Sequence, residues 1–83
     1  MKKVPKIILD SFLLSANRFW KYGGSCDPVI DMAKVLQKYS GVDWICWKDL
    51  ADAIFGVNGF NAEATDKQFY QILNILGVEV VDE

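Results

Sequence analysis

The sequence predicts a mainly α-helical fold, a compact four-helix domain with a minimal pairing of two β-strands. Three observations predict it. Apolar residues recur at spacings of three and four in four segments, a glycine follows each of these segments, and a valine-rich run comes near the end of the chain. With 83 residues, 52% of them hydrophobic, the chain has room for one core. We therefore expect residues 1–83 to form a single domain.

The chain begins with three lysines in its first six residues, and we expect residues 1–6 to form a basic flexible arm. A first helix is predicted over residues 7–21, and Gly23 and Gly24 end it. Its apolar stripe consists of Ile8, Leu9, Phe12, Leu13, Ala16, Phe19 and Trp20. This helix and its turn, residues 7–27, are expected to precede a helical core with a terminal strand in residues 28–83.

The second helix has a clear beginning and end in the sequence. Asp27 is a favourable N-cap, and Pro28 suits the first helical position. The helix is expected to end at Ser40, before Gly41. The next residues, Val42–Ile45, have high β propensity and predict a short strand.

Two further helices are predicted, over residues 47–55 and 66–76. Thr65 and Gln68 have the spacing of a capping box, which predicts that Thr65 caps the last helix. After Gly77 the residues Val78–Val81 predict a terminal strand. The expected partner of this strand is Val42–Ile45, because a single strand is not stable alone.

The charges are divided unevenly along the chain. Residues 1–41 carry seven Lys and Arg against three Asp, a net charge of +4. Residues 42–83 carry two Lys against eight acidic residues, a net charge of −6, so the whole chain has −2. Two interpretations remain open: ordinary solvated faces, or a charged partner for one of the halves.

The residue types exclude most catalytic and metal chemistry. Histidine is absent, which removes the usual general base and the commonest metal ligand. Cys26 and Cys46 supply too few ligands for zinc, and Asp49 and Asp52 make a poor calcium cage. The glycines match neither a P-loop nor a dinucleotide fingerprint. We expect no catalytic residues, no cofactor, no metal and no enzymatic activity.

The expected location of the protein follows from what the sequence lacks. No stretch approaches the roughly 20 apolar residues that cross a bilayer, and no secretory signal is present. Two cysteines without such a signal indicate reduced thiols. We expect a cytoplasmic protein with no membrane partner.

Helix 47–55, helix 66–76 and the terminal strand together suggest a winged-helix-like domain that binds nucleic acid. The connection of about ten residues and the acidic final strand disfavour this alternative. If nucleic acid binds, the binding residues are expected in the basic first half: Lys2, Lys3, Lys6, Arg18 and Lys21.

From about Val29 to Glu83 the sequence resembles region 1.1, the N-terminal domain of primary bacterial sigma factors. The matching features are Lys38-Tyr39-Ser40-Gly41, Trp44-Ile45-Cys46-Trp47, Lys48-Asp49-Leu50 with Ala53, the helix with Ile72 and Leu73, and the ending Leu76-Gly77-Val78-Glu79-Val80-Val81-Asp82-Glu83. The first 27 residues add a helix that the family does not require, and Cys46 stands where a capping Ser or Thr is expected.

This resemblance implies a compact three-helix domain with a small strand pairing. It also implies an acidic surface that competes with DNA for the basic channels of the sigma factor and of RNA polymerase. Without the other sigma regions, such a chain is expected to be a small phage- or plasmid-borne regulator.

The leading hypothesis is a non-enzymatic interaction module whose acidic second half binds a basic protein surface, with RNA polymerase or a sigma factor as candidates. The expected partner-binding residues are Asp49, Asp52, Phe60, Glu63, Asp66, Glu79, Asp82 and Glu83. A third alternative is an oligomerising structural protein, because the broad stripe of residues 8–20 could bury a second face in another copy.

Overall fold

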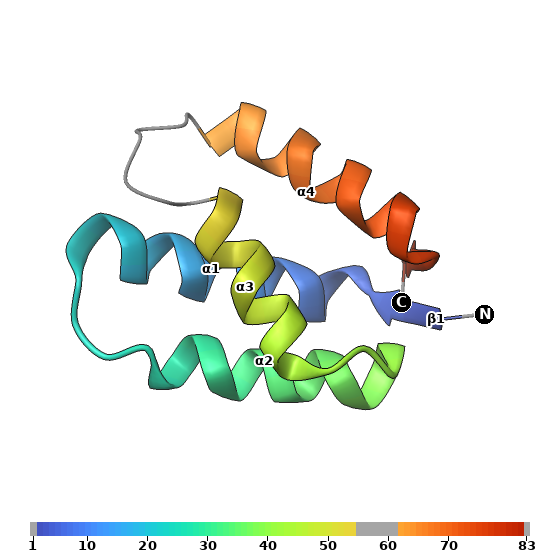
Figure 1. Ribbon diagram of the computed structural model, residues 1–83, viewed down its shortest axis with the longest axis horizontal. Coiled ribbons are helices and arrows are strands. Elements are labelled where there is room, and N and C mark those ends of the chain that lie inside the picture. The colour runs from blue at the N-terminus through green and yellow to red at the C-terminus, as the bar shows by residue number, and fades with distance from the viewer. Residues whose placement is uncertain (1, 55–61, 83) are drawn as a thin grey trace.

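The computed structural model describes residues 2–54 and 66–82 in full, together with the backbone of residues 62–65. The chain forms a small, mainly helical domain, which confirms the predicted fold class (Figure 1). Its elements are β1 (Lys2–Pro5), α1 (Lys6–Tyr22), α2 (Asp27–Ser40), α3 (Trp44–Ile54), α4 (Ala62–Leu76) and β2 (Val78–Val81).

Helix α1 lies in the middle of the domain, between α2 and α4 (Figure 1). Helices α1 and α2 run side by side and are joined by a short loop that contains Gly23 and Gly24, both with positive φ. Helix α3 crosses α1 and α2 on one side, and the first and last elements, β1 and β2, lie side by side. The buried face of α1 belongs to the same core as the buried residues of α2, α3 and α4.

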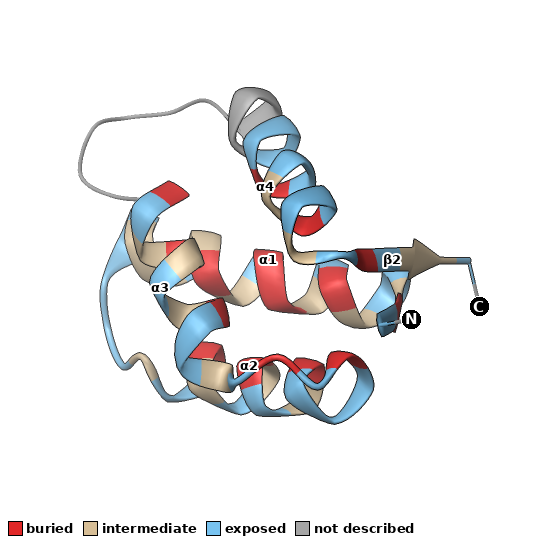
Figure 2. Ribbon diagram, turned by 45° about the vertical axis from the view of Figure 1, so that its right-hand side comes forward, coloured by how far each residue is buried: buried red, intermediate tan, exposed pale blue. Residues whose placement is uncertain are grey.

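Three aromatic side chains join α1, α3 and α4 in the centre of the core. Trp47 stacks on Phe69 with a centroid distance of 5.9 Å, and Phe12 lies 6.2 Å from Trp47 and 6.0 Å from Phe69. All three side chains are fully buried. The buried positions of each helix face this centre (Figure 2). They include Leu9, Leu13, Ala16, Val29, Ala33, Leu36, Ala51, Ile54 and Leu73.

The β pairing differs from the prediction. The terminal strand β2 pairs in parallel with β1, with Val4 beside Val80 and Pro5 beside Val81. Val4 is fully buried, and α1 and α2 both contact β1. The expectation of a flexible arm over residues 1–6 is therefore wrong, because this buried valine anchors the strand and Lys6 already begins α1.

The predicted strand Val42–Ile45 is also wrong, and polar caps explain why. The Asp43 carboxylate accepts the Ile45 N–H at 2.9 Å, and the Gln37 side-chain oxygen accepts the Trp44 N–H at 3.0 Å. These two acceptors satisfy free N–H groups of a helix N-terminus, so α3 begins at Trp44. Val42 is 8% exposed and packs in the core without joining a sheet.

Two predicted helix N-caps are also wrong, because each residue lies inside its helix and not before it. Asp27 is the first residue of α2 rather than its N-cap, and its own N–H donates to the Ser25 hydroxyl at 3.2 Å. Helix α4 begins at Ala62, which places Thr65 inside the helix and not at its cap. The glycine ends are confirmed: Gly41 and Gly77 both have a φ of 73°, a conformation that other residues adopt only at a cost.

Leu73 on α4 provides a test of this packing. Leu73→Ala is expected to lower the free energy of unfolding by about 2–5 kcal/mol, because the side chain is 2% exposed and its removal leaves a cavity. Ile75→Ala is the matched control on the same helix, since Ile75 is 83% exposed. Urea unfolding measures both. Equal effects of the two substitutions would contradict the orientation of α4.

Candidate functional site

The strand pairing places the beginning of α1 beside the end of the chain. Pro5 is paired with Val81 in the parallel register. The next residue along each chain segment, Lys6 after Pro5 and Asp82 after Val81, therefore lies in the same neighbourhood. Asp82 contributes to the raised pKa of the Lys6 ammonium group, which agrees with this placement. Two residues at opposite ends of the sequence thus belong to one surface.

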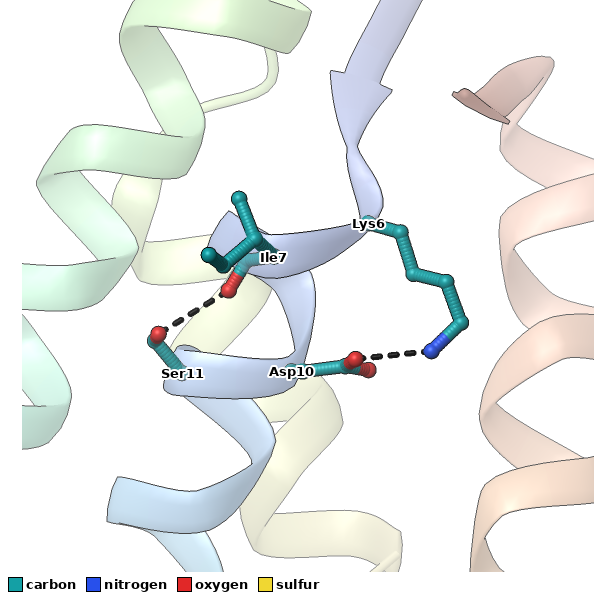
Figure 3. Close-up of polar contacts among 4 residues, drawn as sticks. All are labelled: Lys6, Ile7, Asp10 and Ser11. Atoms are coloured by element: carbon teal, nitrogen blue, oxygen red, sulfur yellow. Dashed lines mark hydrogen bonds and ion pairs between the residues drawn. The ribbon is translucent and has the colours of Figure 1, made fainter. Parts of the chain in front are cut away.

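Lys6 is bound most closely by Asp10, one helical turn along α1. Its Nζ lies 2.7 Å from the Asp10 carboxylate, and both side chains are half exposed. Figure 3 shows this ion pair on the side of α1 that faces α4. Asp10 is the main cause of the raised pKa of Lys6, and Tyr70 of α4 adds to it. Exposure keeps the ion pair weak, so Asp10 remains available to other cations.

Asp66 brings a third carboxylate to this region from α4. The residue is exposed, and its pKa is raised, first because neighbouring atoms partly shield the carboxyl from water and second because the negative charge of Asp10 repels it. Lys6 acts in the opposite direction but does not cancel these two effects. We call Asp10, Asp66 and Asp82, with Lys6 among them, the acidic surface.

The raised pKa of Asp66 predicts a pH-dependent cost to stability. A carboxyl whose pKa is higher in the folded state than in the unfolded state destabilises the fold when it is ionised. The cost is absent at low pH, where both states are protonated, and it is fully present above the raised pKa. Asp66→Asn is therefore expected to stabilise the protein at neutral pH by about a few tenths of a kcal/mol, since the group is exposed to solvent screening.

Urea unfolding at pH 7 and at about pH 3, below the ordinary pKa of Asp, measures this effect. The stabilisation by Asp66→Asn is expected to disappear at the lower pH. A stabilisation of the same size at both pH values would show that the ionised carboxylate is not its cause.

Asp49 and Asp52 form a separate group on α3. The Lys48 Nζ donates to the Asp52 carboxylate at 3.0 Å, and this contact is the main cause of the raised pKa of Lys48. Asp49 and Cys26 also act on Lys48, so this part of α3 lies beside the loop before α2. The predicted acidic residues are thus divided between two surfaces.

The remaining predicted residues have different positions. Glu79 is exposed on β2 and pairs in register with Lys3 of β1, which places a positive charge beside it. The side chains of Phe60, Glu63 and Glu83 lie outside the described residues.

The alternative set of basic residues is spread over the two ends of α1. Lys2, Lys3 and Lys6 lie at its beginning, whereas Arg18 is twelve residues further on, about 18 Å along the helix axis. Lys21 lies beyond it in the last turn. Lys3 and Lys6 also have acidic neighbours, in Glu79 and Asp10. The fold does not bring these residues into one surface.

Sequence reasoning missed Asp10 as a member of the site, because Asp10 belongs to the half with a net positive charge. Its spacing of four from Lys6 is typical of an ion pair on a helix, and this pattern could have indicated it. The approach of Asp66 could not be predicted in this way, since it depends on how α4 packs beside α1.

The described residues offer no metal centre. Between residues 2 and 54 and between 66 and 82, no group of three or more Cys, Asp or Glu side chains is placed to hold a metal ion. Cys26 and Cys46 are both free thiols. Among the described helices, none is long and apolar enough to cross a membrane.

Comparison with protein-family models, with curated proteins and with solved structures found no match. The fold and the site define a small, mainly helical domain with an acidic surface between α1, α4 and the end of β2.

Proposed function

We propose that this protein is a non-enzymatic interaction module that binds a basic protein surface through its acidic surface. The observation that carries the proposal is the placement of three carboxylates, Asp10, Asp66 and Asp82, around Lys6. The raised pKa of Asp66 agrees with it, since Lys6 does not offset the effects of partial shielding from water and of Asp10. An arginine or lysine from a partner would lower this pKa and relieve the repulsion between the two carboxylates.

The cost of Asp66 to stability supports the same proposal. A carboxylate held near another carboxylate lowers the stability of the isolated domain, and such departures from the best fold are typical of binding sites. A basic partner would remove the repulsion between the carboxylates when it binds, so the free energy that the repulsion costs the isolated domain would add to the binding free energy. Asp82 then extends the surface at the end of β2, where it is exposed.

The other acidic residues are assigned supporting roles in this proposal. Asp49 and Asp52 on α3 and Glu79 on β2 would contribute long-range attraction to a basic partner rather than direct contacts, because they lie outside the acidic surface. Phe60, Glu63 and Glu83 stay predicted contacts, with Phe60 as an apolar anchor.

RNA polymerase and sigma factors are the proposed partners, and transcription regulation in the cytoplasm is the proposed role. The resemblance of residues 29–83 to sigma region 1.1 supports this choice, since that family presents an acidic surface to basic channels. Asp66 and Asp82 both lie near Lys6, which is compatible with the same mode of binding.

The test is the affinity of the immobilised protein for purified bacterial RNA polymerase core enzyme, measured by biolayer interferometry at low and moderate salt. We expect binding that weakens as salt rises, because exposed charges are screened over about 10 Å at 0.1 M. Asp66→Asn and Asp82→Asn are each expected to weaken binding by about 1.5- to 5-fold. Asp31→Asn removes one exposed charge from α2, outside the acidic surface, and is expected to weaken binding less than either of these substitutions.

Three outcomes would contradict the proposal. The first is no binding to the core enzyme. The second is binding that the Asp66 and Asp82 substitutions leave unchanged. The third is a gel shift showing that the protein binds DNA with an affinity that depends on Lys2 and Lys3, which would favour the nucleic-acid alternative.

A further inference from the structure

The outward face of α1 carries three large exposed apolar side chains among polar ones. Ile7 is 65% exposed, Leu14 is 52% exposed and Tyr22 is 82% exposed. Spacings of seven and eight residues place these three side chains on one stripe, together with Arg18. The stripe lies opposite the buried positions of the helix, Leu9, Phe12, Leu13 and Ala16.

Two opposite charges, one at the edge of this stripe and one within it, are arranged symmetrically about Leu14. Asp10 lies four residues before Leu14, and Arg18 lies four residues after it. Suppose that two copies of α1 pack antiparallel and cross at Leu14. A residue that lies a given number of positions before Leu14 in one copy then faces the residue that lies the same number of positions after Leu14 in the other copy. Asp10 of one copy then faces Arg18 of the other, and the contact occurs twice in a twofold dimer.

The two ends of the stripe carry an exposed side chain and a pocket. At the C-terminal end of α1 lies a pocket of about 370 Å³. It is lined by Ser15, Arg18, Phe19, Tyr22, Gly23, Ser25 and Pro28. Ile7 lies seven residues from Leu14, about 10.5 Å along the axis, so in the antiparallel pair it lies opposite the last turn of the other α1. The projecting Ile7 side chain of one copy would thus reach the pocket of the other.

We infer that the outward face of α1 binds a second copy of this chain, in an antiparallel pair whose twofold axis passes near Leu14. The Lys6–Asp10 ion pair does not oppose this, because both side chains are 50% exposed and the pair is weakly held. Asp10 belongs to the acidic surface as well. Asp66 and Asp82 lie apart from the stripe, so Asp66→Asn and Asp82→Asn test the binding of the basic partner, whereas Leu14→Asp tests the dimer. The two proposals can therefore fail independently.

The test is the molar mass in solution, measured by sedimentation equilibrium over a range of concentrations from about ten micromolar to about one millimolar, where weak dimers are detected. We expect the mass to rise from 9.4 kDa towards twice this value. Asp10→Arg and Arg18→Asp are each expected to raise the dimer dissociation constant about tenfold or more, because each places like charges opposite one another.

The double substitution Asp10→Arg with Arg18→Asp restores opposite charges at both contacts, so it is expected to recover most of the lost affinity. Leu14→Asp is expected to leave a monomer. Ile75→Asp introduces the same carboxylate at an exposed apolar position on α4 and is expected to dimerise like the original protein. Circular dichroism of each variant checks that it is folded.

Two results would overturn the inference. One is a mass of 9.4 kDa at every concentration. This result would show that no second copy covers the stripe, which then binds a different partner or stays exposed to solvent. The other is a dimer that is insensitive to Leu14→Asp, or one in which the double substitution is no stronger than either single substitution. Such a dimer would use another surface or another orientation.

Discussion

Replacing Trp47 by alanine is expected to lower the free energy of unfolding by about 3–5 kcal/mol. The indole is fully buried, stacks on Phe69 at 5.9 Å and meets the edge of Phe12 at 6.2 Å. It therefore joins α3 to both α1 and α4, and its loss opens a cavity at the point where three helices meet. Most small domains have a total stability of about 5–15 kcal/mol, so much of it would be lost.

Two further variants separate the contribution of the Trp47 ring from that of its N–H group and from the general effect of removing a tryptophan from α3. The Trp47 Nε1 atom is buried and has no hydrogen-bond partner within the described residues. Trp47→Phe keeps an aromatic ring and removes this N–H, so it is expected to cost much less than alanine. Trp44→Ala on the same helix is also expected to cost less, because Trp44 is only half-buried beside the Lys34 ammonium. Urea unfolding that gives equal losses for Trp44→Ala and Trp47→Ala would contradict the packing.

Replacing Val4 by aspartate is expected to destabilise the protein by about 4 kcal/mol or more. Val4 is fully buried in β1, where it pairs with Val80 of β2. The substitution removes an apolar side chain from the core and places a carboxylate there, and each change is costly. Ile75→Asp introduces the same charge at an exposed position and is expected to have little effect.

A milder variant keeps this prediction testable if Val4→Asp does not fold. Val4→Thr retains the shape of valine and adds one hydroxyl, so the domain is expected to remain folded with a weaker strand pair. Hydrogen exchange of the backbone amides in Val78–Val81 is then expected to be faster than in the original protein. Unchanged exchange in this strand would contradict its pairing with β1.

The helices were predictable because each buries one apolar stripe, but their beginnings depend on local polar contacts. Val42, Trp44 and Ile45 have high β propensity, yet Asp43 and Gln37 cap a helix there. Thr65 has the spacing of a capping residue, but Ala62–Ala64 are compatible with helix and extend α4 past it. The β propensity of four residues does not determine whether they form a strand or the first turn of a helix.

The strand pairing could not be predicted from the pattern of β1. Only Val4 among its three residues before Pro5 is apolar, and two lysines precede it. A strand of this kind is stable only because α1 and α2 pack against it, which is a property of the folded domain. The parallel pairing also joins the two ends of the sequence, so no local signal can indicate it.

The candidate site was predictable as a set of acidic residues but not as a surface. The division of the sequence into a positive and a negative half does not persist in space, since the fold places Lys3 beside Glu79 and Lys6 near Asp66 and Asp82. Asp66 and Asp82 were found from their charge, whereas Asp10 was not. Asp49 and Asp52, equally acidic in the sequence, lie on a different surface.

The most direct test of the acidic surface is the titration of the Asp66 carboxyl group, followed by NMR of its side-chain carbon. We expect a pKa above the ordinary value for Asp, because partial shielding from water and Asp10 both disfavour the charged form. Asp10→Asn is expected to lower this pKa, and Lys6→Gln is expected to raise it further. An ordinary pKa that responds to neither substitution would contradict the placement of Asp66 beside Asp10 and Lys6, and with it the proposed binding surface.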